Sequence, residues 1–255
     1  MKKIFLSLLL FFLSLTLFSI DKKIVSLTPA ITSILIDIGY SDNIVGVTSN
    51  DFFLKRTVIG TIININEEKI ILLSPDIIIY QDFQEFLVSG LKNILRKKEF
   101  IRLNIKDVNS IFNETKKILN YLGKSQRELN RWMDDYKREI NKCKNSINKN
   151  FKYIFIVDRD PDFKSIFVSG NSSFISEILN SIGGINIIES NRDYIKINQE
   201  FLLSLDGVVV FDSSFNKFYN NKLFYEKYLV IDNKNITIPD LRLNEKVKYL
   251  CGLLK

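Results

Sequence analysis

Short apolar segments rich in β-branched residues alternate along this chain with amphipathic stretches of helical period. Several are apolar at consecutive positions, as at residues 77–79, which is typical of strands covered on both faces in a parallel sheet flanked by helices. The pattern predicts an α/β protein of two similar halves. The predicted strands are 23–27, 44–47, 76–80 and 100–103 in the first half and 153–157, 166–168, 207–211 and 229–231 in the second.

The stretch between the halves lacks strand character. Apolar residues recur there at helical spacing as far as Gly123, which is suited to end a helix. A second apolar stripe predicts a helix of about 24 residues, or ~36 Å at 1.5 Å per residue. Trp132 and Tyr136 lie on this stripe, so we expect them to pack rather than to bind a ligand. The expected domains are an export signal (1–19), a first α/β lobe (20–122), a linking helix (123–148) and a second α/β lobe (149–255).

The two halves also resemble each other. Residues 28–39 align without gaps with 172–183, and each segment opens on a hydroxyl residue suited to cap a helix and closes on a glycine. Residues 66–73 align in the same way with 198–205, and each block precedes a predicted strand. The alternative is chance similarity between helix-strand units. Two lobes of like build would place their strand-end loops around a central cleft, where open α/β sheets bind ligands.

The first twenty residues differ in composition from the rest of the chain. Lys2 and Lys3 precede an apolar run that ends at Ile20, and Ser19 is a small residue suited to cleavage. This is the pattern of a secretory signal. The alternative is an uncleaved membrane anchor, although the run is at the short end of the length that spans a bilayer. Because no cysteine follows the run, we expect no lipid anchor and a freely soluble exported protein.

The amino-acid composition excludes several kinds of catalytic and metal-binding site. The chain has no histidine in 255 residues, which excludes Ser-His-Asp and Cys-His catalysis, histidine-built zinc sites and histidine haem ligands. Its two cysteines, Cys143 and Cys251, are too far apart in sequence for a CxxC motif, so they either form a disulfide or remain buried thiols. Lys and Arg outnumber Asp and Glu by 36 to 29, but the excess is spread along the chain and predicts no nucleic-acid-binding surface.

No sequence motif of an enzyme is present: there is no GxSxG, no GxGxxG and no Walker loop. An enzyme would have to depend on carboxylates such as Asp158, Asp160 and Asp162. That run is more typical of a solvated turn after a strand, and it lacks the spaced ligands of a calcium loop. We therefore expect no catalytic residue, no metal site and no intrinsic cofactor.

A set of motifs runs through both halves. The first half carries KIVSLTPAIT (23–32), IVGVT (44–48) and, after Glu68, LSPDIII (73–79); the second carries FVSG (167–170), IGGINI (182–187) and then Glu200. Together they resemble the class III periplasmic binding proteins that deliver cobalamin, haem and iron-siderophores to ABC importers, with the cobalamin-binding members nearest in pattern. The resemblance implies two Rossmann-like lobes, each with a mainly parallel sheet, bridged by a long rigid helix, with a ligand cleft between them.

The resemblance also implies ligand-binding residues in the loops of both lobes. These are Thr28, Pro29, Ala30, Asn50, Phe52, Ile62 and Gln81, with Phe53 and Thr61 beside them, and then Phe167, Tyr194 and Arg242. Cobalamin-binding members use several tryptophans at such positions, where this chain has Asn50, Ile62, Gln81 and Tyr194. Haem would need a tyrosine ligand, Tyr194 or Tyr80. A ferric siderophore would want aromatic walls and a cation, for which the candidates are Arg159, Arg192 and Arg242.

Glu68 and Glu200 are implied to dock the protein on its importer. One carboxylate on each lobe would pair with arginines of the permease dimer in the inner membrane, and such pairing supplies orientation. Each glutamate would also complement the dipole of a helix that follows an asparagine cap. We expect a periplasmic monomer that hands a corrinoid, haem or ferric siderophore to this permease. The alternatives are an exported ligand-sensing or scaffold domain and a carboxylate-based secreted enzyme.

Overall fold

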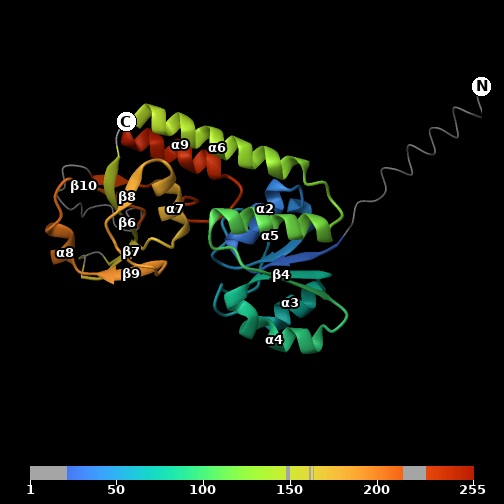
Figure 1. Ribbon diagram of the computed structural model, residues 1–255. Coiled ribbons are helices and arrows are strands. Elements are labelled where there is room, and N and C mark those ends of the chain that lie inside the picture. The colour runs from blue at the N-terminus through green and yellow to red at the C-terminus, as the bar shows by residue number, and fades with distance from the viewer. Residues whose placement is uncertain (1–21, 148–149, 161, 163, 215–227) are drawn as a thin grey trace, which may run out of the picture. The chain divides into compact units, whose positions relative to one another are not determined.

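The computed structural model describes residues 22–147, 150–160, 162, 164–214 and 228–255. The chain divides into two compact units, Met1–Arg102 and Leu103–Lys255 (Figure 1). The export signal predicted over residues 1–19 lies outside the described residues. Of the helices in the described ranges, none is both long enough and apolar enough to cross a bilayer.

The first unit is built on a five-stranded sheet in the order β3-β2-β1-β4-β5. Its strands are β1 (Ile24–Ser26), β2 (Ile44–Val47), β3 (Thr57–Val58), β4 (Ile77–Gln81) and β5 (Glu99–Leu103). β1 pairs in parallel with β2 and β4, and β2 pairs in parallel with β3. The strands predicted at 23–27, 44–47, 76–80 and 100–103 are confirmed, whereas the two-residue β3 was not predicted.

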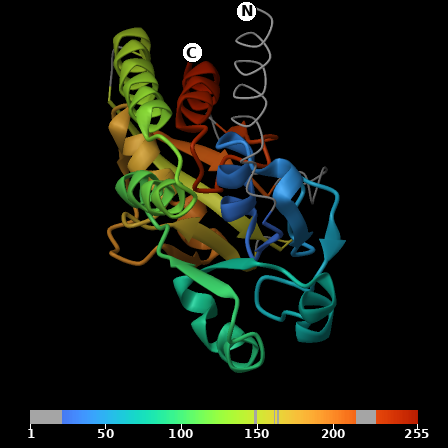
Figure 2. The same cartoon turned by 90° about the vertical axis from the view of Figure 1, so that its right-hand side faces the viewer.

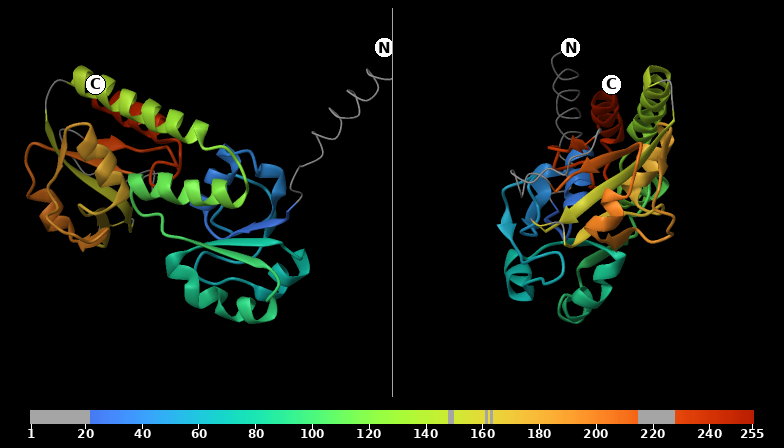
Figure 3. Two further views of the ribbon diagram at one scale, coloured as in Figure 1. Left: turned by 45° about the vertical axis from the view of Figure 1, so that its right-hand side comes forward. Right: turned by 90° about the vertical axis from the view of Figure 1, so that its left-hand side faces the viewer.

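Helices cover both faces of this sheet, as the continuous apolar strands predict. α2 (Pro29–Asp37) lies on one face, and α3 (Glu67–Leu73) and α4 (Glu85–Ile94) lie on the other (Figures 1 and 3). Ile70 of α3 and Leu91 of α4 share one buried cluster with Val25 and Ile78 of the strands. The short 3-10 helices η1 (Ser41–Asn43) and η2 (Asp82–Gln84) precede β2 and α4.

The second unit is built on a mixed six-stranded sheet in the order β11-β10-β6-β7-β9, with β8 also paired to β6. Its strands are β6 (Phe151–Arg159), β7 (Ile166–Ser169), β8 (Gly184–Asn186), β9 (Tyr194–Ile197), β10 (Val208–Asp212) and β11 (Tyr228–Val230). β6 pairs in parallel with β10 and β8, and β10 in parallel with β11. β7 is antiparallel to both β6 and β9. The predicted α/β class and the strands at 153–157, 166–168, 207–211 and 229–231 are confirmed, whereas β8 and β9 were not predicted.

The helices of the second unit are α5 (Val108–Tyr121), α6 (Arg127–Ile147), α7 (Phe174–Ser181), α8 (Gln199–Leu203) and α9 (Leu243–Leu254). The long helix predicted over 123–148 is present as α6, although its linking role stays a prediction. The division between the units falls after Arg102 rather than at residue 122, because α5 packs against α6 and groups with it. Tyr136 of α6 is buried, as its place on the apolar stripe predicts, and Trp132 is half-buried.

The sequence repeat corresponds to matched helix starts. Asn66 and Asn198 cap α3 and α8, and each side-chain oxygen accepts a bond of 2.9 Å from the backbone N–H three residues later. Thr28 caps α2, but the cap of α7 is Ser173, one residue after the hydroxyl that the alignment matches to Thr28. Gly39 follows α2 and Gly183 follows α7 with φ of 85° and 100°, values that glycine adopts without strain.

A disulfide joins the two helices that lie side by side in Figures 1 and 2, α6 and α9. It links Cys143 to Cys251, whose Cα atoms are 5.7 Å apart. Of the two states that the sequence allows for these cysteines, the structure has the paired one. The bond closes a chain segment with a sequence separation of 108, which contains every strand of the second sheet.

Replacing both cysteines, Cys143→Ser with Cys251→Ser, is expected to lower the free energy of unfolding by about 2–4 kcal/mol, because the open chain gains conformational entropy when it unfolds. Urea unfolding followed by circular dichroism measures the loss. A reductant should produce the same loss in the wild-type protein and no change in the double variant. A wild-type midpoint that a reductant does not move would contradict a stabilising role.

Candidate functional site

Predicted site residues of the first unit gather at one edge of its sheet. Thr28 follows β1, Asn50 follows β2, Ile62 follows β3 and Gln81 is the last residue of β4. Because these strands run in parallel, their carboxyl ends meet at the same edge, where open α/β sheets bind ligands. The structure therefore brings together residues that lie far apart in the sequence.

Thr28, Pro29 and Ala30 form the start of α2 at this edge. All of their side chains are buried, and the Thr28 hydroxyl accepts a 3.4 Å bond from the backbone N–H of Ile31. Pro29 stands at the first helical position, where a missing N–H costs nothing. These residues set the helix in place and offer little side-chain surface to a ligand.

The loop after β2 offers more exposed side-chain surface to a ligand. Phe52 is 48% exposed, and its ring lies 4.6 Å, centroid to centroid, from the ring of Phe53. Within the part of the chain that the structure describes, Thr48 Oγ1 and Asp51 Oδ2 are buried without a hydrogen-bond partner. Buried polar atoms are normally paired, so this loop keeps two hydrogen-bonding atoms for a ligand or water.

Gln84, which the sequence analysis did not single out, forms hydrogen bonds with three backbone groups at this edge of the sheet. Its buried side-chain amide donates to the carbonyl of Leu27 at 3.1 Å and to that of Ile62 at 2.8 Å, and its Oε1 accepts from the backbone N–H of Gln81 at 3.0 Å. One side chain thus fixes the chain after β1, after β3 and at the end of β4. The contacts to Leu27 and Ile62 span 57 and 22 residues of sequence, so no local motif predicts them, whereas the contact to Gln81 is local.

In the second unit, two of the predicted ligand residues share a pocket. A cavity of about 380 Å³ is lined by Val157, Asp158, Phe167, Tyr194 and Thr237. Phe167 is 41% exposed and Tyr194 is 51% exposed. The third predicted residue, Arg242, is not part of this lining; it precedes α9, and its backbone N–H donates to Asp240 Oδ1 at 3.1 Å.

The sequence analysis misplaced Asp158. The run from Asp158 to Asp162 was predicted as a solvated turn, but Asp158 and Arg159 are the last two residues of β6, and Asp158 faces the pocket. Asp160 does begin the turn, where its Oδ1 accepts from the backbone N–H of Lys164 at 2.7 Å. Among the residues that the structure describes, no group of three acidic or cysteine side chains is placed to hold a metal ion.

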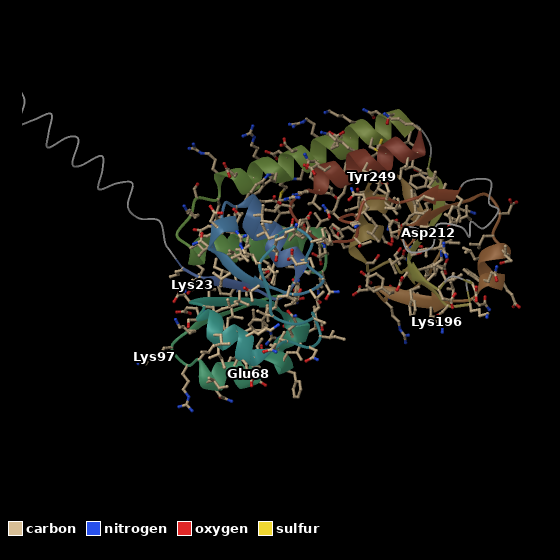
Figure 4. All side chains as sticks on the ribbon, turned by 180° about the vertical axis from the view of Figure 1, so that it is seen from behind. Lys23, Glu68, Lys97, Lys196, Asp212 and Tyr249 are labelled. Atoms are coloured by element: carbon tan, nitrogen blue, oxygen red, sulfur yellow. A yellow bond between two sulfur atoms is a disulfide. The ribbon has the colours of Figure 1, made fainter. Side chains whose placement is uncertain are left out.

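Arg159 is not available to a ligand, contrary to the prediction that it could serve as a siderophore-binding cation. Its side chain is fully buried, and its Nε donates to Asp212 Oδ2 at 2.9 Å (Asp212 is labelled inside the second unit in Figure 4). Tyr228 also donates its hydroxyl to Asp212. A buried arginine needs such a carboxylate, because an unpaired buried charge is strongly destabilising. Arg192 lies on an exposed loop.

Of the two tyrosines predicted as haem ligands, Tyr194 lines the 380 Å³ pocket of the second unit. Tyr80 is buried, its hydroxyl donates to Glu85 Oε2 at 2.7 Å, and burial raises its pKa. Partial burial, followed by the nearby Asp193 carboxylate, also raises the pKa of Tyr194. Both effects favour the protonated phenol over the phenolate.

A second cavity, of about 610 Å³, contains none of the predicted site residues. It lies at the amino ends of β6 and β8, opposite the edge where ligands of such sheets bind. Its lining consists of Lys144, Asn150, Asn180, Ile182, Gly183, Gly184 and Ile185.

Glu68 and Glu200 occupy matched places. Each is exposed and is the second residue of its helix, Glu68 in α3 and Glu200 in α8 (Glu68 is labelled in Figure 4). An exposed leucine follows each within one helical turn: Leu72 is 82% exposed and Leu203 is 56% exposed. Each unit therefore presents a carboxylate and an apolar side chain on the same small surface.

Residues 24–223 match a family model described as periplasmic binding protein. In Bacillus subtilis (strain 168), the uncharacterized ABC transporter substrate-binding lipoprotein YvrC is 30% identical over 205 residues, which span 75% of this chain but only 64% of that relative. Because the relative is a lipoprotein by name, the absence of a lipid anchor stays a prediction for this chain.

Two solved structures show a similar fold. The periplasmic vitamin B12 binding protein BtuF of Vibrio cholerae has a TM-score of 0.72 at 20% identity, with 91% of this chain and 96% of that chain covered. The siderophore binding protein FhuD of Vibrio cholerae, with Fe3+-Desferal bound, has a TM-score of 0.73 at 15% identity, with 92% and 98% covered. At these identities the likeness concerns the fold.

Replacing Gln84 by methionine keeps the length of the side chain and removes its hydrogen bonds. We expect a loss of about 1–3 kcal/mol in the free energy of unfolding, because buried backbone groups lose their partners. Hydrogen exchange should also become faster at the Gln81 amide, which Gln84 holds.

The matched control is Gln126→Met. The Gln126 side-chain amide donates to Asn120 Oδ1 near the surface, so the loss in the free energy of unfolding should stay within about 0.5 kcal/mol. Equal losses in the two variants, or an unchanged exchange rate at Gln81, would show that Gln84 does not hold this edge.

Proposed function

The chain belongs to the periplasmic binding protein family, and from this we propose that it is the solute-binding component of an ABC importer. It captures a corrinoid, haem or ferric siderophore outside the cytoplasmic membrane and delivers it to a permease. It acts as a monomer and carries no catalytic chemistry. The relatives that support this proposal are named as a transporter substrate-binding lipoprotein, a vitamin B12 binding protein and a siderophore binding protein.

The observation that carries the proposal is the pocket of the second unit. Its volume of about 380 Å³ lies within the range of roughly 300–1,000 Å³ that is common for small-molecule sites. Aromatic walls with a few convergent polar groups are typical of such sites, and Phe167, Tyr194, Thr237 and Asp158 supply both. In the first unit, the exposed Asn50 and Phe52 and the half-buried Ile62 offer a second surface at the carboxyl edge of the sheet, whereas Gln81 is buried there.

Phe167→Ala and Tyr194→Ala are each expected to weaken ligand binding by about 1–3 kcal/mol, because each removes an aromatic wall of the pocket. Calorimetric titration with cyanocobalamin, haemin and ferric desferrioxamine measures the loss, and thermal shift gives an independent readout because a ligand raises the apparent stability. Phe201→Ala is the matched control, since Phe201 is similarly exposed on α8 and does not line the pocket.

Two results would count against this function. If none of the three probes binds or raises the melting temperature, the chain does not bind solutes of these classes. If Phe201→Ala weakens binding as much as the pocket variants do, the pocket of the second unit is not the site.

We also propose that Glu68 and Glu200 dock the protein on its permease. Carboxylates at matched positions in two units suit pairing with arginines on the two subunits of a permease, and each adjacent exposed leucine suits an apolar contact beside the ion pair.

Glu68→Lys and Glu200→Lys are each expected to reduce uptake of the ligand into cells by at least about tenfold. Reversing the charge of a paired glutamate opposes association of the protein with its permease. Ligand affinity of the purified protein should stay unchanged. The control is Glu99→Lys with Glu189→Lys, which reverses two other exposed carboxylates, one in each unit. Uptake that survives both docking substitutions, or that falls equally in the control, would contradict the docking role.

A further inference from the structure

Cationic side chains gather at the amino edge of the first unit's sheet, opposite the edge that carries the predicted ligand residues. Lys23 precedes β1, and Arg96, Lys97 and Lys98 lie in the turn between α4 and β5. Ile94, the last residue of α4, is 58% exposed beside this turn. We call these five residues the amino-edge patch. Figure 4 labels Lys23 and Lys97 on the same side of the first unit.

Asp76, at the amino end of β4, joins the two parts of the patch. Its Oδ1 accepts from Lys98 Nζ at 3.0 Å, and its Oδ2 accepts from the backbone N–H of Lys23 at 3.0 Å. The hydrogen bond from Lys98 is the largest of the effects that lower the pKa of Asp76, and the charge of Lys23 is among the others. Cations that are far apart in the sequence therefore meet at one point of the surface.

The amino-edge patch has a net positive charge. It holds four cationic side chains, whereas the carboxylates beside it are those of Glu99 and of Asp76, which is held in the ion pair with Lys98. Farther along the same edge, Arg56 and Asp42 carry opposite charges. The fold thus concentrates at this edge part of the basic excess that is spread along the sequence.

Capping of α4 explains only part of this arrangement. Arg96 Nε donates to the carbonyl of Asn93 at 3.0 Å, as cations near the end of a helix do. Lys23 lies on another element, and the exposed Ile94 takes no part in capping. Cations around an exposed aliphatic side chain suit the surface of an anionic bilayer, where the charges meet lipid phosphates and the aliphatic group enters the interface.

The place of the patch in the chain favours the same partner. Lys23 closely follows the apolar run that ends at Ile20, and such a run enters a membrane during export or as an anchor. A basic surface directly after the run lies at the bilayer for as long as the run stays attached. A single-stranded nucleic acid would instead want aromatic platforms between the cations, and none of the five patch residues is aromatic.

We propose that the amino-edge patch binds the anionic phospholipid surface of a membrane and keeps the protein close to the bilayer. This goes beyond the proposed function, because it concerns where the protein resides rather than which solute it binds. Each lysine or arginine close to an anionic bilayer strengthens binding by roughly fivefold, and salt weakens the attraction by screening it.

The test is co-sedimentation with vesicles of the protein purified as its own cell exports it. One set of vesicles contains phosphatidylglycerol and phosphatidylcholine in equal parts, and the other contains phosphatidylcholine alone. We expect binding to the anionic set to be at least about tenfold tighter and to be lost at high salt. The comparison cancels any membrane affinity of the N-terminal apolar run, because that run enters both sets.

Lys23→Glu with Lys97→Glu should weaken binding to the anionic vesicles by about tenfold or more. The matched control is Lys116→Glu with Lys248→Glu, which changes the net charge equally at two exposed lysines of the second unit. Melting temperatures equal to that of the wild type show that a loss of vesicle binding is not a loss of the fold.

The apolar member of the patch has its own test. Ile94→Ser should weaken binding to the anionic vesicles by about threefold, because an aliphatic group no longer enters the interface. The matched control is Ile63→Ser, since Ile63 is also exposed but follows β3, near the carboxyl edge of the same sheet.

Three results would overturn the proposal. The first is equal binding of the wild-type protein to the two sets of vesicles. The second is a loss in the Lys116 and Lys248 control as large as that in the patch variant. The third is full displacement from the vesicles by a single-stranded oligonucleotide at equal phosphate concentration, which would assign the patch to a nucleic acid.

Discussion

Hydrogen bonding between parallel strands allows the chain to return only through a crossover, so the loops that follow such strands leave from one edge of the sheet. In the first unit this constraint gathers Thr28, Asn50, Ile62 and Gln81, which no local interaction would bring together. In the second unit β6 runs parallel to β10 and ends at Asp158 and Arg159, beside the pocket. The candidate site follows from strand direction before any side chain is considered.

Side chains then hold these edges by contacts that are distant in sequence. In the first unit a neutral amide, that of Gln84, satisfies three backbone groups at once. In the second unit a buried ion pair, Arg159 with Asp212, lies directly behind the pocket wall. A buried pair adds little stability compared with apolar packing, but losing one partner is costly. The charge of Arg159 is therefore compensated inside the second unit and is not available to a ligand.

The sequence predicted the fold well because strands and helix starts are marked by residues that are close together in the sequence. Apolar runs identify the central strands, and the caps at Asn66 and Asn198 mark both matched helices. β8 and β9 were missed because short strands beside polar loops carry little periodicity. Phe167 and Tyr194, which the family resemblance implies as ligand-binding residues, line one pocket. The resemblance could not show that Arg159 turns inward, since its partner Asp212 is 53 residues away. Pairing over such distances is decided by tertiary packing.

The cross-link between α6 and α9 makes the second unit a covalent ring. All strands of its sheet, from β6 to β11, lie between Cys143 and Cys251. A protease that cuts any one loop within this ring leaves both pieces attached to each other, and the sheet can hold them in register by its remaining hydrogen bonds. The unit thus tolerates a single nick for as long as the disulfide stays oxidised, as it does in compartments without a thiol-reducing system.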